Sequence, residues 1–267
     1  MPALPVVARA ALHFGEEPCI SGEKGSGTVF FTGCTLRCRF CQNAPISRDN
    51  FGKTISVERL AEIFAELEAA GAQNINLVNP THYAHAIAAA LRLRRPGVPV
   101  LWNSSGYERV ETLRGLEGLV DVYLPDCKYV HSDIAAALSG TADYFVYAAP
   151  ALLEMARQTG PVMLDADGRI CKGTIVRHLV LPGNTRESMA VLDWLAQYKE
   201  RFWVSLMFQY TPMGDLHGHP ELTRPLTRRE CDKVWTYMDS LGIVNGYVQS
   251  RKSSGKDSIP PFDLTGV

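Results

Sequence analysis

The chain alternates short β-branched or aromatic runs with segments of helical periodicity, and this alternation constrains its fold more than any other feature. Buried strands are expected at residues 28–32, 74–78, 98–102, 119–124, 174–181 and 202–208. Helices are expected at residues 56–71, 81–95, 142–159, 184–200 and 227–242. Such alternation favours parallel strands joined by right-handed crossovers. The 267 residues therefore predict an α/β fold, a single-domain partial (β/α)6 TIM-like barrel with N-terminal and C-terminal extensions.

The expected barrel domain spans residues 26–245. Residues 1–25 form the expected N-terminal extension, and residues 246–267 form a polar, proline-rich C-terminal tail that packs across the barrel or frays. A short hairpin is expected around Asp167 and Gly168, before the fifth strand.

The charge balance argues against a nucleic-acid partner. The chain has 27 basic and 28 acidic residues, a formal net charge of −1, and no basic run longer than "RLRR" at 92–95. It contains no window of 18 apolar residues, and its start lacks the apolar core of a signal peptide. We therefore expect a cytoplasmic protein without a membrane partner, whose seven cysteines stay reduced and serve a metal or redox centre.

Three of the cysteines lie close together in "GCTLRCRFCQN", residues 33–43. Cys34, Cys38 and Cys41 follow directly after the first expected strand. In parallel α/β folds the loops at the carboxyl ends of the strands carry the chemistry. A [4Fe–4S] cluster normally takes four cysteine ligands, so three thiolates would leave one iron open to another ligand.

Two other interpretations of the cysteines fit less well. A structural zinc site needs a fourth cysteine or histidine at a regular spacing, whereas the remaining cysteines are isolated. A thioredoxin-like motif has no additional cysteine ahead of its pair. An iron–sulfur or zinc protein without further chemistry, used for electron transfer or binding, stays as the alternative function.

The Cys-x3-Cys-x2-Cys spacing, with Phe40 before the last cysteine, resembles the radical S-adenosylmethionine (SAM) superfamily. The longer stretch "GEKGSGTVFFTGCTLRCRFCQN", residues 22–43, resembles its pyruvate formate-lyase activating enzyme-like branch. The resemblance implies a (β/α)6 partial barrel, a [4Fe–4S] cluster and SAM bound at the open iron. It also implies reductive cleavage of SAM to methionine and a 5′-deoxyadenosyl radical that abstracts a substrate hydrogen.

The resemblance also assigns cofactor-binding residues to the loops that follow successive strands. They lie in "NPTH" (79–82), "NSSG" (103–106), "LPDCK" (124–128), "RHLVLPGN" (177–184) and "QYTPMG" (209–214). Together with the cluster loop, these motifs give Phe40, Asn79, Thr81, Ser104, Asp126, Lys128, Arg177 and Tyr210. The chain departs from the branch in three places: "NPTH" replaces a Gly-Gly-Glu stretch, Asn103 replaces an aspartate that helps hold a cation beside SAM, and Thr211 replaces a histidine.

The resemblance implies partners as well. No further ferredoxin-like cysteine cluster is inserted, so an external flavodoxin or ferredoxin is the expected electron donor. The expected substrate is either a glycine of a glycyl-radical protein or a small molecule.

Overall fold

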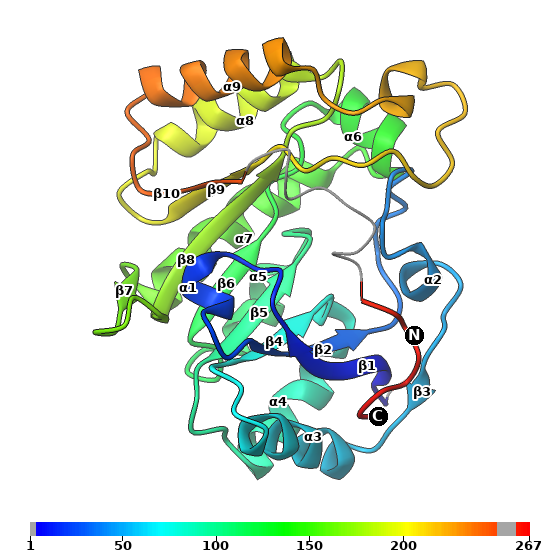
Figure 1. Cartoon of the computed structure of the whole chain (residues 1–267), viewed down its shortest axis with the longest axis vertical. Helices are drawn as coiled ribbons and strands as arrows, with labels where there is room; N and C mark the ends of the chain where they lie inside the picture. The colour runs from blue at the N-terminus through cyan, green and yellow to red at the C-terminus, as the bar shows by residue number, and fades with distance from the viewer. Residues whose placement is uncertain (1–3, 250–259) are drawn as a thin grey trace.

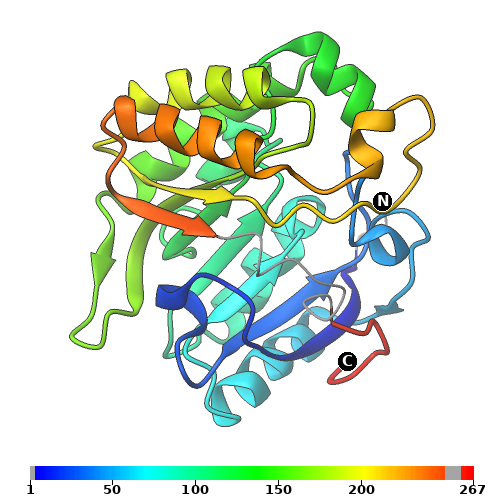
Figure 2. The same ribbon diagram turned by 45° about the horizontal axis from the view of Figure 1, so that its top comes forward.

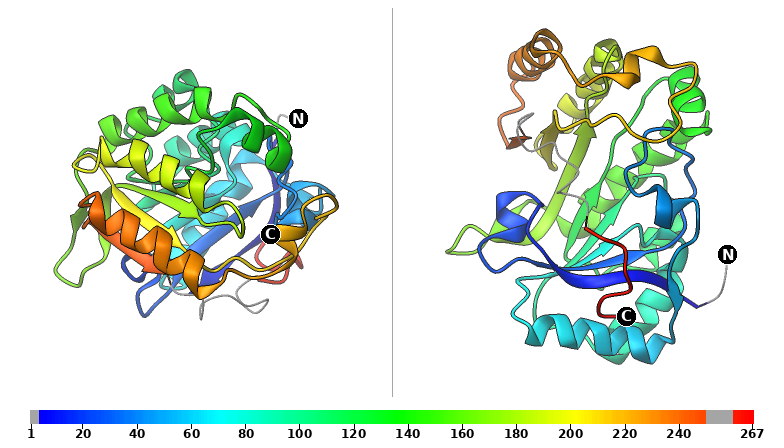
Figure 3. Two further views of the ribbon diagram at one scale, coloured as in Figure 1. Left: turned by 90° about the horizontal axis from the view of Figure 1, so that it is seen from above. Right: turned by 45° about the vertical axis from the view of Figure 1, so that its right-hand side comes forward.

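The computed structural model describes residues 4–249 and 260–267, which form a curved, mostly parallel sheet with helices on its outer face (Figures 1 and 3). The strands are β1 (Val6–His13), β2 (Ser26–Phe31), β3 (Lys53–Thr54), β4 (Ile75–Val78), β5 (Val100–Ser104), β6 (Val122–Pro125), β7 (Met163–Leu164), β8 (Ile170–Leu179), β9 (Trp203–Met207) and β10 (Gly246–Gln249). The helices are α1 (Pro18–Ser21), α2 (Ala44–Ser47), α3 (Val57–Ala69), η1 (Thr81–Tyr83), α4 (Ala84–Leu93), α5 (Val110–Arg114), α6 (Ser132–Ser139), α7 (Tyr144–Thr159), α8 (Thr185–Ala196), η2 (Pro220–Thr223) and α9 (Arg228–Ser240).

The strand order is β10-β9-β8-β6-β5-β4-β2-β1-β3, and β7 pairs with β8. All neighbours from β2 to β10 on this path are parallel, whereas β1 runs antiparallel to β2. Because β10 and β3 stand at opposite ends of this order, backbone pairing does not close the sheet into a complete barrel. This confirms the α/β partial barrel.

All six expected strands are present, as are the five expected helices and the hairpin between β7 and β8. Helix α3 shows why these segments could be predicted from the sequence. The Ser56 side chain accepts a hydrogen bond from the backbone N–H of Arg59, and Leu60, Phe64 and Leu67 are buried at helical spacing.

Besides β7 of the expected hairpin, three strands of the sheet lie outside the six that were expected: β1, the two-residue β3 and β10. β1 belongs to the N-terminal extension, and β10 adds a further parallel strand at the start of the expected C-terminal tail. The final residues pair with the sheet, because the backbone N–H of Leu264 donates to the carbonyl of Ala8 and that of Ala10 to the carbonyl of Thr265 (Figure 2). The middle of the expected tail, residues 250–259, lies outside the described residues.

The N-terminal extension fills the inside of the curved sheet at the amino ends of its strands. In α1, Cys19 and Ile20 are buried against Leu101, Val122 and Ile175 from β5, β6 and β8. This contact closes one end of the barrel and leaves the site at the other. No helix in the described ranges is both long and apolar enough to cross a membrane.

Candidate functional site

The loop that carries the three cysteines is anchored where β2 ends. Gly33 has a φ of +92°, and a Cβ added there would lie 3.0 Å from Nε2 of His82. His82 Nε2 donates to the carbonyl of Thr32 at 2.7 Å, and the Asn79 amide donates to the carbonyl of Gly33. The "NPTH" segment therefore holds the start of the cysteine loop. Position 33 needs a glycine because its backbone is left-handed and because a side chain there would collide with the His82 ring.

The three thiols lie near one another in different surroundings. Burial raises the pKa of Cys34 to about 11 and also raises the pKa of Cys38. The Lys128 ammonium acts in the opposite direction on both thiols, but its effect is smaller than that of burial. Cys38 Sγ lies 3.0 Å from the Ser139 hydroxyl, and Cys41 Sγ lies 3.3 Å from the Ser47 hydroxyl.

The donor set fits an iron–sulfur cluster. Within residues 4–249 and 260–267, no group of three or more His, Cys, Asp or Glu side chains is arranged to hold a single metal ion. Cysteine thiolates that bind a cubane each take a different iron, so they surround the cluster without meeting at one point. Cys34, Cys38 and Cys41, on one loop and with hydroxyl groups beside two of them, provide such a set.

The carboxyl end of α6 supports the outer side of the cysteine loop. The backbone N–H groups of Arg37 and Arg39 donate to the carbonyls of Ser139 and Leu138 at 3.0 and 2.9 Å. The Tyr129 hydroxyl lies 2.9 Å from that of Ser139, which itself contacts Cys38. A hydrogen-bonded chain from Tyr129 through Ser139 therefore reaches a ligand of the expected cluster.

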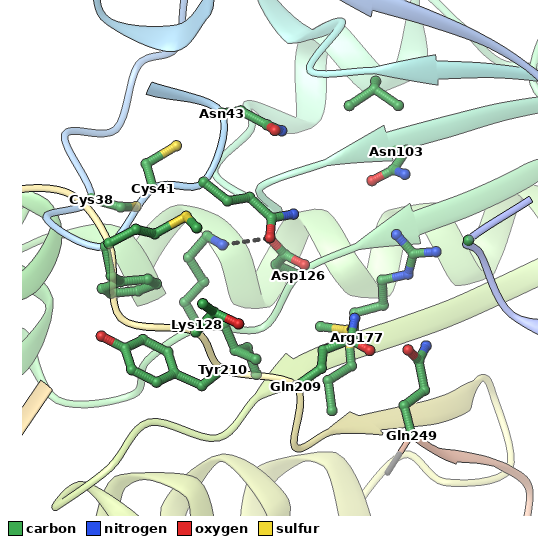
Figure 4. A pocket seen from close by; sticks show the side chains of 18 of the residues that line it. Cys38, Cys41, Asn43, Asn103, Asp126, Lys128, Arg177, Gln209, Tyr210 and Gln249 are labelled. Carbon is green, nitrogen blue, oxygen red and sulfur yellow. Dashed lines mark hydrogen bonds and ion pairs between the residues drawn. The ribbon is translucent and has the colours of Figure 1, made fainter. Parts of the chain in front are cut away.

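A cavity of about 290 Å³ extends from the cysteine loop along the inner face of the sheet. Figure 4 shows Cys38 and Cys41 at one end of this cavity and Arg177 and Gln249 at the other. It is lined by residues from the loops after several strands and from the sheet itself, among them Phe40, Asn43, Asn103, Asp126, Lys128, Gln209, Tyr210 and Thr211. A space that begins at the thiols and ends in hydrogen-bonding groups suits an elongated polar cofactor.

Asp126 and Lys128 form an ion pair of 2.5 Å in the middle of the cavity wall. Burial opposes the charge of Lys128, but the ion pair and hydrogen bond with Asp126, together with the nearby Cys38, outweigh burial and raise the pKa of the lysine, which stays an ammonium. Between them, Cys127 points to the opposite side of the strand and is fully buried among the helices, as strand alternation predicts.

A buried tyrosine fixes the backbone of this pair. The Tyr144 hydroxyl lies 2.8 and 2.9 Å from the carbonyls of Ser105 and Asp126, and it accepts from the backbone N–H of Lys128 at 3.0 Å. Burial raises the pKa of Tyr144 well above its ordinary value, so the hydroxyl keeps its proton. Gly106 packs directly on the Asp126 carbonyl with a φ of +74°, a position that leaves no room for a Cβ.

The far end of the cavity is a charged network. Arg177 donates from Nε to Glu17 at 2.9 Å and from its terminal nitrogen to both Glu16 and Glu17. The amide of Gln249 also donates to Glu17, and the Asn103 amide donates to Glu16. Two carboxylates against one guanidinium leave one negative charge in excess, and Arg177 lowers the pKa of Glu17 despite its burial.

The structure brings only some of the sequence-predicted residues to the cavity. Asp126, Lys128, Arg177, Phe40 and Tyr210 line it together with Cys38 and Cys41. The rings of Phe40 and Tyr210 meet edge to face with centroids 6.1 Å apart, and the Tyr210 hydroxyl donates to the carbonyl of Leu222.

The other three predicted residues are engaged elsewhere. Asn79 holds the cysteine loop, and the hydroxyls of Thr81 and Ser104 lower the pKa of the buried Glu108, which burial raises overall. Ser104 ends β5 with its side chain on the helix-covered face beside Trp102, whereas Asn103 lines the cavity. The period of two along a strand explains this difference of one residue.

Sequence reasoning missed several residues of the site. Glu16, Gln209 and Gln249 line the cavity, yet no motif contains Glu16, and the strand that ends at Gln249 was expected to be tail. The period of two along β5 is the sequence signal that could have placed the side chain of Asn103, and not that of Ser104, in the cavity. Tyr144 lies inside an apolar helical pattern, where nothing marks its hydroxyl.

A parallel α/β partial barrel with a three-cysteine loop at the carboxyl end of its first parallel strand defines a class of iron–sulfur enzymes, and comparison with known families gives the same result. Residues 28–195 match the Radical SAM superfamily. The chain therefore belongs to the radical SAM superfamily, whose members bind a [4Fe–4S] cluster and SAM.

An uncharacterized protein of Methanocaldococcus jannaschii is 31% identical over 233 residues, which cover 84% of this chain and 64% of that protein. The chain thus matches less than two thirds of the length of this relative.

Solved structures share the fold at low sequence identity. The [FeFe]-hydrogenase maturase HydG has a TM-score of 0.56 and 13% identity, covering 89% of this chain and 55% of that one. Methylornithine synthase has a TM-score of 0.52 and 13% identity, covering 83% and 70%. Streptococcus suis SuiB bound to S-adenosylmethionine has a TM-score of 0.51 and 12% identity, covering 82% and 45%.

Proposed function

We propose that the chain cleaves SAM reductively and uses the product to abstract a hydrogen atom from a substrate. The observation that carries this proposal is that one cavity is lined by both Cys38 and Cys41, at one end, and the Asp126–Lys128 pair, in the middle. When bound, the cluster and SAM supply an electron and a 5′-deoxyadenosyl radical, with methionine as the other product.

The residues of the cavity suit the charges of SAM. Lys128 is held as an ammonium and would pair with the carboxylate of SAM, while Asp126 would accept from a hydroxyl or ammonium group. The excess negative charge of Glu16 and Glu17 over Arg177 favours a ligand that carries cationic groups. Phe40 and Tyr210 present aromatic surface beside the cysteine loop, which excludes water from that end.

Anaerobic reconstitution tests the proposal. We expect about four irons with matching sulfide per chain, and slow formation of 5′-deoxyadenosine and methionine when dithionite and SAM are added. Lys128→Ala should slow SAM cleavage and weaken SAM binding without changing the iron content, because Lys128 does not ligate the cluster. Lys172→Ala, at an exposed position of β8, is the matched control. Formation of only methylthioadenosine or S-adenosylhomocysteine would contradict hydrogen abstraction, and zinc without sulfide would favour the alternative of a non-SAM metal protein.

The hydrogen donor that we propose to test first is a protein glycine, because the sequence of residues 22–43 resembles the activating-enzyme branch. A glycyl-radical EPR doublet on a co-expressed glycyl-radical protein, dependent on SAM and on Cys38, supports this substrate. If 5′-deoxyadenosine forms and no doublet develops, a small molecule is the substrate to seek.

A further inference from the structure

Three arginines surround a hollow on the outer surface of the cysteine loop, away from the SAM cavity. Arg37, Arg39 and Arg48 line it with Ala136, Ala137 and Gly140 of the α6 terminus and with Asp215. The residues contributed by α6 are small; Arg37 is exposed, and Arg39 and Arg48 are partly exposed. The hollow encloses about 270 Å³ and opens to the surface.

The positive charge of this hollow is mostly uncompensated. Asp215 is the acidic residue among its lining, and it meets Arg39 only at 3.8 Å. Arg48 donates to the carbonyl of Cys38, and Arg39 Nε donates to the carbonyl of Ala137 at the end of α6. These two contacts also support the loop and the helix terminus. Arg37 is exposed, and its guanidinium makes no hydrogen bond or ion pair within the described residues.

The hollow lies directly against the loop that carries Cys38. Cys38 is buried with its sulfur toward Ser139, while its two neighbours Arg37 and Arg39 project to the surface. A protein bound at these arginines would therefore be separated from a cluster ligand by a single layer of backbone. Short separation is what electron transfer into a buried centre requires.

We propose that this hollow, lined by Arg37, Arg39 and Arg48, is the docking surface for an acidic protein that delivers single electrons to the cluster. The proposal rests on the proposed function, since only a redox cluster needs such a donor. An excess of positive charge at the rim of an interface mainly accelerates association with a negatively charged partner. Nucleic acid fits the hollow less well, because no aromatic side chain occurs among its described lining residues and the chain as a whole is slightly acidic.

The test is charge reversal at the two arginines of the loop, with reduced flavodoxin as the probe. Arg37→Glu/Arg39→Glu should lower the second-order rate constant of cluster reduction by about tenfold or more at low ionic strength. The difference should shrink as salt is added. Arg37→Glu alone should show a smaller, equally salt-dependent loss, while its reduction by photoreduced deazaflavin and its SAM cleavage with that reductant should match the unsubstituted protein, because the Arg37 side chain makes no hydrogen bond or ion pair with the described residues. The control is Arg94→Glu/Arg228→Glu, since both residues are exposed and lie outside the hollow.

Two further arms keep the outcome decisive. If the double variant loses iron, the single variant Arg37→Gln is used, because the Arg37 side chain makes no hydrogen bond or ion pair with residues 4–249 and 260–267. Binding of oxidised flavodoxin to the protein without its cluster should weaken in the same order, and this measurement does not depend on radical chemistry. Equal flavodoxin rates and affinities for variant and control would overturn the docking surface, as would arginine-dependent binding of a single-stranded oligonucleotide without binding of flavodoxin. A protein that is reduced through the arginines and yet never cleaves SAM would refute the proposed function alone.

Discussion

Removing the hydroxyl of Tyr144 should destabilise the fold and loosen the site together. The hydroxyl joins the loop after β5 to the end of β6 through the carbonyls of Ser105 and Asp126 and the N–H of Lys128. In Tyr144→Phe the ring stays packed, but one donated and one accepted hydrogen bond are lost. A lost hydrogen bond costs about 1 kcal/mol and a buried N–H left without a partner about 1–3 kcal/mol, so we expect a loss of about 2–4 kcal/mol.

Urea unfolding of the cluster-free protein, followed by intrinsic fluorescence, measures this loss. Tyr107→Phe is the control, because its hydroxyl donates at 3.0 Å to the exposed Asp143 and its removal should change the free energy of unfolding by less than about 0.5 kcal/mol. After reconstitution, Tyr144→Phe should also bind SAM more weakly, with unchanged iron. A loss no larger than that of Tyr107→Phe would refute the argument that the hydroxyl holds the Asp126–Lys128 backbone.

Three further predictions concern the surroundings of the site. Gly106→Ala forces a side chain into a left-handed backbone and against a neighbouring carbonyl, and should cost at least about 1–3 kcal/mol in the same urea experiment. Glu187 raises the pKa of His131 by a hydrogen bond of 2.5 Å, so His131 stabilises the fold fully below its unfolded pKa of about 6.5. This contribution disappears as pH rises through the folded value, and unfolding midpoints of the unsubstituted protein and His131→Asn should converge there. Ser139→Ala removes a hydrogen bond to Cys38 and should lower the reduction potential of the reconstituted cluster without loss of iron. The potential is measured by EPR-monitored titration. An unchanged potential would show that this hydroxyl does not tune the cluster.

Short-range patterns were sufficient to predict the architecture. The helix cap at Ser56 and the buried positions of α3 lie within a few turns of one another. The interactions that form this helix therefore involve residues that are close together in the sequence. The cysteine loop is equally local, because three ligands on one loop need no distant partner. The sequence by itself therefore determined the cysteine loop, the superfamily and the six parallel strands β2, β4, β5, β6, β8 and β9 that build the barrel.

Only the tertiary structure decided what stands opposite the cysteines. Glu16 and Glu17 meet Arg177 across about 160 positions of sequence, and a charge pair between such distant residues leaves no periodic signal. The assignment of Asn103 to the cavity instead of Ser104 depended on the phase of β5, which a one-residue shift reverses. The arginine hollow likewise exists because α6 ends against the cysteine loop, about 100 residues away in the chain, so its surface arises from packing that no motif contains.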